Sequence, residues 1–467
     1  MEKKKTSFLR HLADLIIQNK TLLEENEKLH KQVDHLSNEV SKYEKLLAQS
    51  KNPIKEIQVT NPKIKKNIKY KTSTVLFAET EGFNKISAEM DSKLLVDNLD
   101  EIFILLQSII EKYEIRNARS IGDSFMCVGG IPRKNITNPI EVILAAIEMQ
   151  FYIRELQRVY YDKKIWELKI GIHTGPVVAS INSRKQNNYD IKGDTVNIAT
   201  RIRSYCKSGE ILISETTYEL VKDVINCEYY GKMPVKYKGD LLMYSVTGIK
   251  SDYSLQGKGL IPNKKFSIRF SLIQFTDLQE MMLDKLEKEL PQNLYYHNVK
   301  HTVDVVTQAE LIGIGEGVTD EELVLLKTAA LFHDSGHIYD YNDHEHYSIK
   351  IAKEILPDYY YTQSQIAIIS GLIMATKLPP EPKTKLEEIM CDADLDYLGR
   401  SDMIPISTSL YNELKERGNV ASLVEWNKMQ IRFISNHQYF TNTARSLREV
   451  NKQKQIERIR NLVTAEV

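Results

Sequence analysis

The spacing of hydrophobic residues changes twice along this 467-residue chain, so one architecture cannot accommodate all of it. Residues 1–50 carry a heptad pattern, which is typical of a coiled coil. Between residues 73 and 247, short apolar runs alternate with amphipathic helical stretches, which favours a domain that mixes helices and strands. From residue 266 to 467 the spacing is mostly helical, up to a charged C-terminal helix. The sequence therefore predicts a coiled coil, an α+β domain and an all-α domain.

The heptads predict a coiled coil of two parallel helices. Leucines occupy the d positions at Leu15, Leu22, Leu29 and Leu36, while valine and asparagine share four of the six a positions. Valine at a with leucine at d favours a parallel dimer, and a buried asparagine fixes the register. A single amphipathic helix packed on its own domain is the alternative.

Composition excludes several classes of protein. The 63 Lys and Arg balance the 63 Asp and Glu, which argues against a protein built mainly to bind nucleic acid. No apolar run approaches the ~18 residues of a membrane span, and no apolar segment follows the basic N-terminus. The four cysteines show no CxxC pairing, as expected for a reduced, cytoplasmic protein. Residues 51–72, whose lysines either contact phosphate or are simply solvated, and residues 248–265 are the predicted linkers.

Carboxylates follow two predicted strands of the middle domain. Glu79 follows a buried run, and Asp123 lies in a Gly-Asp turn. Such residues are well placed to hold a divalent cation against phosphates. Asn197 and Arg201 are four residues apart and share one face of a predicted helix, where the arginine can stabilise charge developing on a phosphoryl oxygen. Each signal alone is weak, because an aspartate in a glycine turn is more often only a turn residue.

Four strings together make a stronger signal. They are Val-Leu-Phe-Ala (75–78), Ser-Ile-Gly-Asp-Ser-Phe-Met (120–126), Gly-Ile-His-Thr-Gly-Pro-Val-Val-Ala (171–179) and Tyr-Asp-Ile-Lys-Gly-Asp-Thr-Val-Asn-Ile-Ala-Thr-Arg (189–201). In this order, over residues 73–247, they resemble the class III adenylate and guanylate cyclases. The resemblance implies a ferredoxin-like core and a dimer with its sites at the interface, which a coiled coil would help to assemble.

The resemblance also implies roles for individual residues. Mg²⁺ or Mn²⁺ would be held by Glu79 and Asp123, and Asn197 and Arg201 would act on the transition state. The ribose 3′-hydroxyl would then attack the α-phosphorus and expel pyrophosphate. Glu79 departs from the family, which nearly always has aspartate there, and its extra methylene displaces the carboxylate.

Substrate recognition follows from the same resemblance. The triphosphate would contact Lys236, or alternatively Lys238. By the resemblance, the two positions that contact the base are Arg119 and Asp190 in this chain. Adenylate cyclases have lysine and aspartate at these positions. Because Asp190 can accept from the adenine amino group, we expect ATP rather than GTP.

Histidines cluster in the C-terminal domain, where six of the eleven lie between His297 and His346. Two of these histidines and two aspartates can converge on one metal from successive helices. They are His301, His333, Asp334 and one of Asp392 or Asp394. The adjacent carboxylate of a His-Asp pair can also bridge to a second metal.

This pattern resembles the HD superfamily of metal-dependent phosphohydrolases. The strings 296–301 and 333–337 look more specifically like cyclic-nucleotide phosphodiesterases, and Ala-Asp-Leu at 393–395 resembles their last metal motif. The likeness covers about residues 291–399. It implies one or two divalent cations such as Zn²⁺, Mn²⁺, Mg²⁺ or Fe²⁺. The implied ligands are His301, His333, Asp334 and Asp394.

Further roles follow from this likeness. His297 would be the general acid that protonates the leaving 3′-oxygen. His337 would lie behind the ligands, and His344 and Glu345 would support the site, although loop residues could show the same pattern. No glutamine that could bind a purine is assigned from the sequence.

The predicted function is therefore a cytoplasmic homodimer, joined through its coiled coil and cyclase domains, that binds ATP and a cyclic nucleotide. It would convert ATP to cAMP and hydrolyse cAMP or a related phosphoester. The alternative is a catalytically weak cyclase domain that senses nucleotide and regulates an active HD phosphohydrolase.

Overall fold

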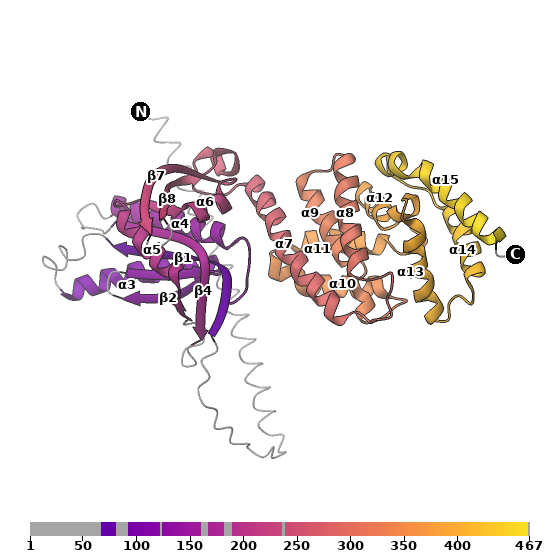
Figure 1. Ribbon diagram of the computed structural model, residues 1–467. Coiled ribbons are helices and arrows are strands. Elements are labelled where there is room, and N and C mark those ends of the chain that lie inside the picture. The colour runs from indigo at the N-terminus through magenta and orange to yellow at the C-terminus, as the bar shows by residue number, and fades with distance from the viewer. Residues whose placement is uncertain are drawn as a thin grey trace, which may run out of the picture. The chain divides into compact units, whose positions relative to one another are not determined.

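The computed structural model describes residues 67–80, 92–121, 124–159, 167–181, 189–235 and 239–465 (Figure 1). The predicted coiled coil, Asp123, Lys236 and Lys238 lie outside these residues. Within them, a domain built on one β-sheet precedes a region made of helices. This confirms the predicted mixed domain followed by an all-α domain.

The first domain contains an eight-stranded sheet with the order β2-β3-β1-β4-β6-β8-β7, and β5 pairs with β4. The strands are β1 (Asn67–Thr80), β2 (Arg116–Ile121), β3 (Ser124–Gly129), β4 (Leu168–Ile181), β5 (Tyr189–Lys192), β6 (Ile211–Ser214), β7 (Ile225–Val235) and β8 (Gly239–Ile249). The central pair, β1 and β4, is antiparallel, and Glu79 lies opposite Lys169. The end of β1 therefore lies in the middle of the sheet.

Helices cover both faces of this sheet. Leu76 and Ala78 of β1 share a core with α3 (Ser92–Lys112) and α4 (Asn138–Val159). Val75 packs on the opposite face with Ala199 of α5 (Asp194–Tyr205). Because successive strand residues face opposite ways, a strand covered on both sides must be apolar throughout, which explains the run Val75–Ala78. A shorter helix, α6 (Glu215–Val221), follows β6.

The stretch predicted as a second linker, residues 248–265, contains regular structure. Strand β8 continues to Ile249, and two short 3-10 turns follow at Ser251–Tyr253 and Leu255–Gly257. A β-bridge joins Ser254 to Pro262 before α7 begins. Hydrophobic periodicity could not reveal these turns, because their order comes from local backbone hydrogen bonds.

The second domain is helical throughout its described residues. Its α-helices are α7 (Lys264–Glu289), α8 (Val299–Gly315), α9 (Asp320–Phe332), α10 (His344–Ile355), α11 (Gln363–Ala375), α12 (Lys385–Asp394), α13 (Met403–Glu416), α14 (Leu423–Asn436) and α15 (Asn442–Ala465). Capping boxes start α9, α11 and α12. The buried faces of α8, α9, α11 and α12 form one core with part of α7. No helix in the described part of the chain is long and apolar enough to cross a membrane.

Candidate metal and nucleotide sites

Four predicted side chains of the helical domain come together in the structure. His301 lies on α8, His333 caps α9, Asp334 follows it, and Asp394 ends α12. Nε2 of His301 lies 3.3 Å from Nε2 of His333, 3.3 Å from Oδ2 of Asp334 and 3.2 Å from Oδ1 of Asp394. Such separations are typical of ligand atoms that share one cation with bonds of about 2.0–2.2 Å.

The chemistry of these donors also fits a cation. Nδ1 of His333 lies 2.8 Å from the carbonyl oxygen of Ala330, which leaves Nε2 as the atom that faces the cluster. Oδ2 of Asp334 is buried without a hydrogen-bond partner. Burial opposes a charged His301, yet the carboxylates of Asp334 and Asp394 outweigh this and raise its pKa to about 8. The carboxylates therefore stabilise positive charge at this point, as they would a divalent cation.

The two aspartates that the residue pattern left open have different surroundings. Asp392 is fully buried and accepts hydrogen bonds from the backbone amides of Phe440, at 2.9 Å, and Thr441, at 2.8 Å. It therefore anchors the start of the segment that leads into α15. Asp394, two residues later, faces the histidines.

His297 lies beside this cluster and is held by a residue that sequence reasoning missed. Nδ1 of His297 lies 2.5 Å from Oε1 of Glu413, a fully buried residue of α13. The same carboxylate accepts the backbone amides of Tyr296 and His297 and the hydroxyl of Tyr341. These bonds outweigh burial and lower the pKa of Glu413 to about 2. Glu413 is 116 residues from His297, so no local spacing could have identified it.

The predicted supporting residues line the same region. The rings of His337 and His344 stack with centroids 4.0 Å apart, and Nε2 of His344 lies 3.5 Å from Oδ1 of Asp334. Burial lowers the pKa of His337 to about 3, which keeps it neutral. Oε1 of the buried Glu345 lies 3.6 Å from Nε2 of His344. His297, Asp334 and His337 also bring potential ligand atoms within 4.8 Å of one another.

A cavity of about 440 Å³ opens from His297 and Asp394 toward α14. Apolar side chains such as Leu410, Trp426 and Phe433 line it, with Gln430 among them. Gln430 and Phe433 are three residues apart, so the sequence places both on one helix face. It does not show that this face lines the cavity, because that depends on where α14 packs.

The amide of Gln430 is oriented by a short hydrogen-bond chain. Nε1 of Trp426 donates to the hydroxyl of Ser407, and that hydroxyl donates to Oε1 of Gln430 at 2.6 Å. Because Oε1 is engaged, the amide NH₂ is the group left for a ligand.

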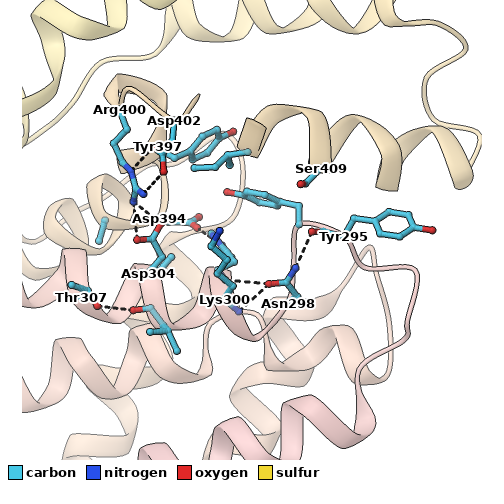
Figure 2. A pocket seen from close by; sticks show the side chains of 16 residues that line it. Tyr295, Asn298, Lys300, Asp304, Thr307, Asp394, Tyr397, Arg400, Asp402 and Ser409 are labelled. Atoms are coloured by element: carbon cyan, nitrogen blue, oxygen red, sulfur yellow. Dashed lines mark hydrogen bonds and ion pairs between the residues drawn. The ribbon is translucent and has the colours of Figure 1, made fainter. Parts of the chain in front are cut away.

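A second cavity, of about 240 Å³, also reaches Asp394 (Figure 2). Arg400 lies in its wall between Asp304 of α8 and Asp402, with Nη1 2.6 Å from Oδ2 of Asp304 and Nη2 2.7 Å from Oδ2 of Asp402. Figure 2 shows this ion-pair triad beside Asp394. The triad ties the segment after Asp394 to α8 and so positions Asp394 next to His301.

In the sheet domain, the described candidate residues fall into two groups. Asn197 and Arg201 lie on the exposed face of α5, and Nη2 of Arg201 donates to the carbonyl of Pro234 at 2.8 Å. Asp190 is also exposed and pairs with Lys192. Arg119 lies on β2, where its backbone pairs with Met126.

Glu79 is separate from that exposed face and forms an ion pair with Arg203 of α5. Sequence reasoning did not include Arg203. The guanidinium of Arg203 neutralises the carboxylate of Glu79, which a metal ion would need as a negatively charged ligand. While Arg203 stays in place, the described part of this site therefore does not fit a metal.

Comparisons with known proteins agree with the two-part fold. A family model described as the adenylate and guanylate cyclase catalytic domain matches residues 66–248, and an HD domain model matches residues 298–396. The receptor-type guanylate cyclase gcy-8 of Caenorhabditis elegans is 32% identical over 202 residues, which are 42% of this chain and 17% of that protein. Guanylate cyclase 32E of Drosophila melanogaster is 31% identical over 177 residues, 37% of this chain and 15% of that protein.

Among solved structures, the adenylyl cyclase CyaB of P. aeruginosa is 29% identical, with a TM-score of 0.36, and the match covers 39% of this chain and 96% of that one. The matches to the two guanylate cyclases span less than a fifth of those proteins. By the two family models, the chain contains a class III nucleotide cyclase catalytic domain at residues 66–248, followed by an HD domain at residues 298–396.

Proposed function

We propose that this chain turns over a cyclic purine nucleotide, which its cyclase domain forms and its HD domain hydrolyses. The observation that carries the proposal is the convergence of His301, His333, Asp334 and Asp394 beside His297 and a largely apolar cavity. A metal cluster next to an apolar cavity suits a phosphodiester joined to a flat base.

In the HD domain, the four clustered side chains would hold a divalent cation, which supplies Lewis acidity and a nucleophilic hydroxide at neutral pH. His297 keeps Nε2 for proton donation, because its Nδ1 is bound to Glu413. We infer that this proton goes to the leaving 3′-oxygen. Glu413 remains ionised, since its pKa is about 2, and it holds the orientation of the imidazole.

The cavity suggests how the base binds. Leu410, Trp426 and Phe433 offer apolar contact to a purine ring. The amide NH₂ of Gln430 would donate to an acceptor on the purine edge, either N1 of adenine or O6 of guanine, because Ser407 occupies Oε1. The HD substrate is therefore proposed to be a purine cyclic nucleotide.

For the cyclase domain we propose ATP as substrate, with Asn197 and Arg201 acting on the transferred phosphorus from the exposed face of α5. Asp190, exposed on β5, would accept from the adenine amino group. The guanylate cyclases among the relatives make GTP the competing substrate. A homodimer would complete each site, because α5 presents both side chains outward.

Product analysis of the purified full chain tests this proposal. The protein is incubated with ATP or GTP and Mn²⁺ or Mg²⁺, beside the variant His333→Ala/Asp334→Ala. The variant should accumulate cAMP, whereas the wild type should yield AMP. Accumulation of cGMP would reverse the proposed base preference. Absence of any cyclic product in both proteins would reject cyclase activity.

One observation favours a second function, in which the cyclase domain only senses nucleotide and regulates the HD domain. Glu79 is already paired with Arg203, so its carboxylate is not free for catalysis. Glu79→Asp separates the two proposals: a large gain in cyclisation would point to a crippled or repurposed site. Deleting residues 1–50 tests the proposed coiled coil, and unchanged dimerisation and activity would reject its role.

A further inference from the structure

The ion pair between Glu79 and Arg203 is built into the sheet domain. The two side chains come from elements 124 residues apart, and both are mostly covered, with 27% of Glu79 and 18% of Arg203 exposed. The guanidinium carbon lies 5.2 Å from the centre of the Phe77 ring. Glu79 is the only acidic residue in an ion pair with Arg203 among the described residues. The contact is therefore specific to this pair of charges.

Helix α5 holds Arg203 in this position through its backbone. A Cβ atom added to Gly171 of β4 would lie 2.3 Å from the amide nitrogen of Arg203 and 2.5 Å from the carbonyl oxygen of Ala199. The helix thus rests directly on the strand, and only glycine permits that approach. Because the backbone of Arg203 is fixed against the sheet, the guanidinium can leave Glu79 only if the side chain adopts another rotamer.

The two arginines of this helix have opposite environments. Arg201 is exposed and donates to the carbonyl oxygen of Pro234, and it forms no ion pair with a carboxylate among the residues that the structure describes. Nε of Arg203 is buried without a hydrogen-bond partner, which leaves Glu79 to stabilise its charge. A guanidinium keeps its positive charge even when it is buried, so Arg203 needs a negative partner.

We propose that Arg203 is a resident cation at Glu79 and competes with divalent metal for this carboxylate. A metal can bind there only after the guanidinium turns away, because two cations at one carboxylate repel each other. The inference rests on the proposed nucleotide binding. It adds that Arg203 raises the concentration of divalent metal at which metal binds to the cyclase domain. It predicts a cyclase site that responds to divalent metal concentration.

The test measures the binding of 3′-deoxy-ATP, which lacks the attacking hydroxyl, to the full chain by calorimetry at increasing Mn²⁺. Arg203→Gln should lower the half-saturating Mn²⁺ concentration about tenfold, as expected when one like charge beside a mostly covered carboxylate is lost. Lys207→Gln is the matched control: it removes one positive charge just beyond the same helix, where Lys207 is exposed. It should leave the Mn²⁺ requirement unchanged.

The double variant Glu79→Gln/Arg203→Gln should lose the gain, because no carboxylate remains to receive the metal. An unchanged or higher Mn²⁺ requirement in Arg203→Gln would overturn the inference, as would an equal shift in Lys207→Gln. If none of the proteins binds the analogue, the proposed nucleotide function fails. The inference is then decided by electron paramagnetic resonance, which follows Mn²⁺ bound per chain as Mn²⁺ is raised, and equal half-saturating concentrations in wild type and Arg203→Gln would overturn it.

Discussion

Replacing Glu413 with glutamine perturbs the HD site without touching a proposed metal ligand. The carboxylate accepts four hydrogen bonds, two from backbone amides on Oε2 and two from His297 and Tyr341 on Oε1. An amide has one accepting oxygen, so its NH₂ must face either the two amides or the His297–Tyr341 pair. Each buried donor left without an acceptor costs about 1–3 kcal/mol, and two donors lose theirs, so we expect a loss of about 2–6 kcal/mol in unfolding free energy.

The same change should affect catalysis more than binding. If the amide NH₂ faces Nδ1 of His297, that nitrogen must become an acceptor, so the ring loses the second proton that makes it an acid. If the amide keeps its oxygen there, the backbone of the 296–297 segment is displaced. In the first case the proton donor loses its acidic form and in the second it is misplaced, so we expect kcat for cyclic-nucleotide hydrolysis to fall about a hundredfold with KM within about threefold.

The measurement is steady-state hydrolysis by the full chain, with bound metal counted and unfolding followed on the same preparations. Glu416→Gln is the matched control, because it makes the same change one turn later, on an exposed residue bonded to Tyr295. It should retain wild-type kcat. A folded, metal-loaded Glu413→Gln protein with kcat within about threefold of wild type would refute the positioning role of this carboxylate.

Three further outcomes are expected. Gln430→Ala should raise KM for the cyclic nucleotide about tenfold or more, whereas Gln453→Ala, an exposed control, should not; equal KM values would exclude base recognition by Gln430. Burial lowers the pKa of His437 to about 4, so the unfolded chain binds the proton more readily. Unfolding free energy should therefore fall as pH drops from about 6.5 to 4, by at most about 3 kcal/mol, and His437→Phe should flatten this slope in urea titrations. A Cβ on Gly336 would lie 1.9 Å from the carbonyl oxygen of His344, so Gly336→Ala should reduce bound metal, and an unchanged metal content would contradict this reasoning.

Much of the architecture could be predicted from local pattern. The run Thr74–Ala78 predicted a short buried strand, and the structure has it within β1, at the centre of the sheet. The histidines gathered between His297 and His346, with the adjacent pair His333-Asp334, indicated a metal cluster, and the structure places Nε2 of His333 3.1 Å from Oδ2 of Asp334. The turns between residues 250 and 263 were not predicted, since their backbone hydrogen bonds have no hydrophobic period.

Local pattern could not predict which residues contact the functional side chains. Glu413 reaches His297 from α13, and Arg203 reaches Glu79 from α5. Asp392 and Asp394 are both acidic and two residues apart, and only their packing separates a structural anchor from a member of the metal cluster.

By itself, then, the sequence determined the order of the domains, the periodicity of their elements and the residue types available for metal and phosphate chemistry. These properties depend on covalent neighbours and on which face of a helix or strand a residue occupies. Only the tertiary structure decided which charges meet: Glu413 with His297, and Arg203 with Glu79. Such pairs depend on the packing of elements far apart in the chain, and a buried charge is stable only where that packing brings it a partner.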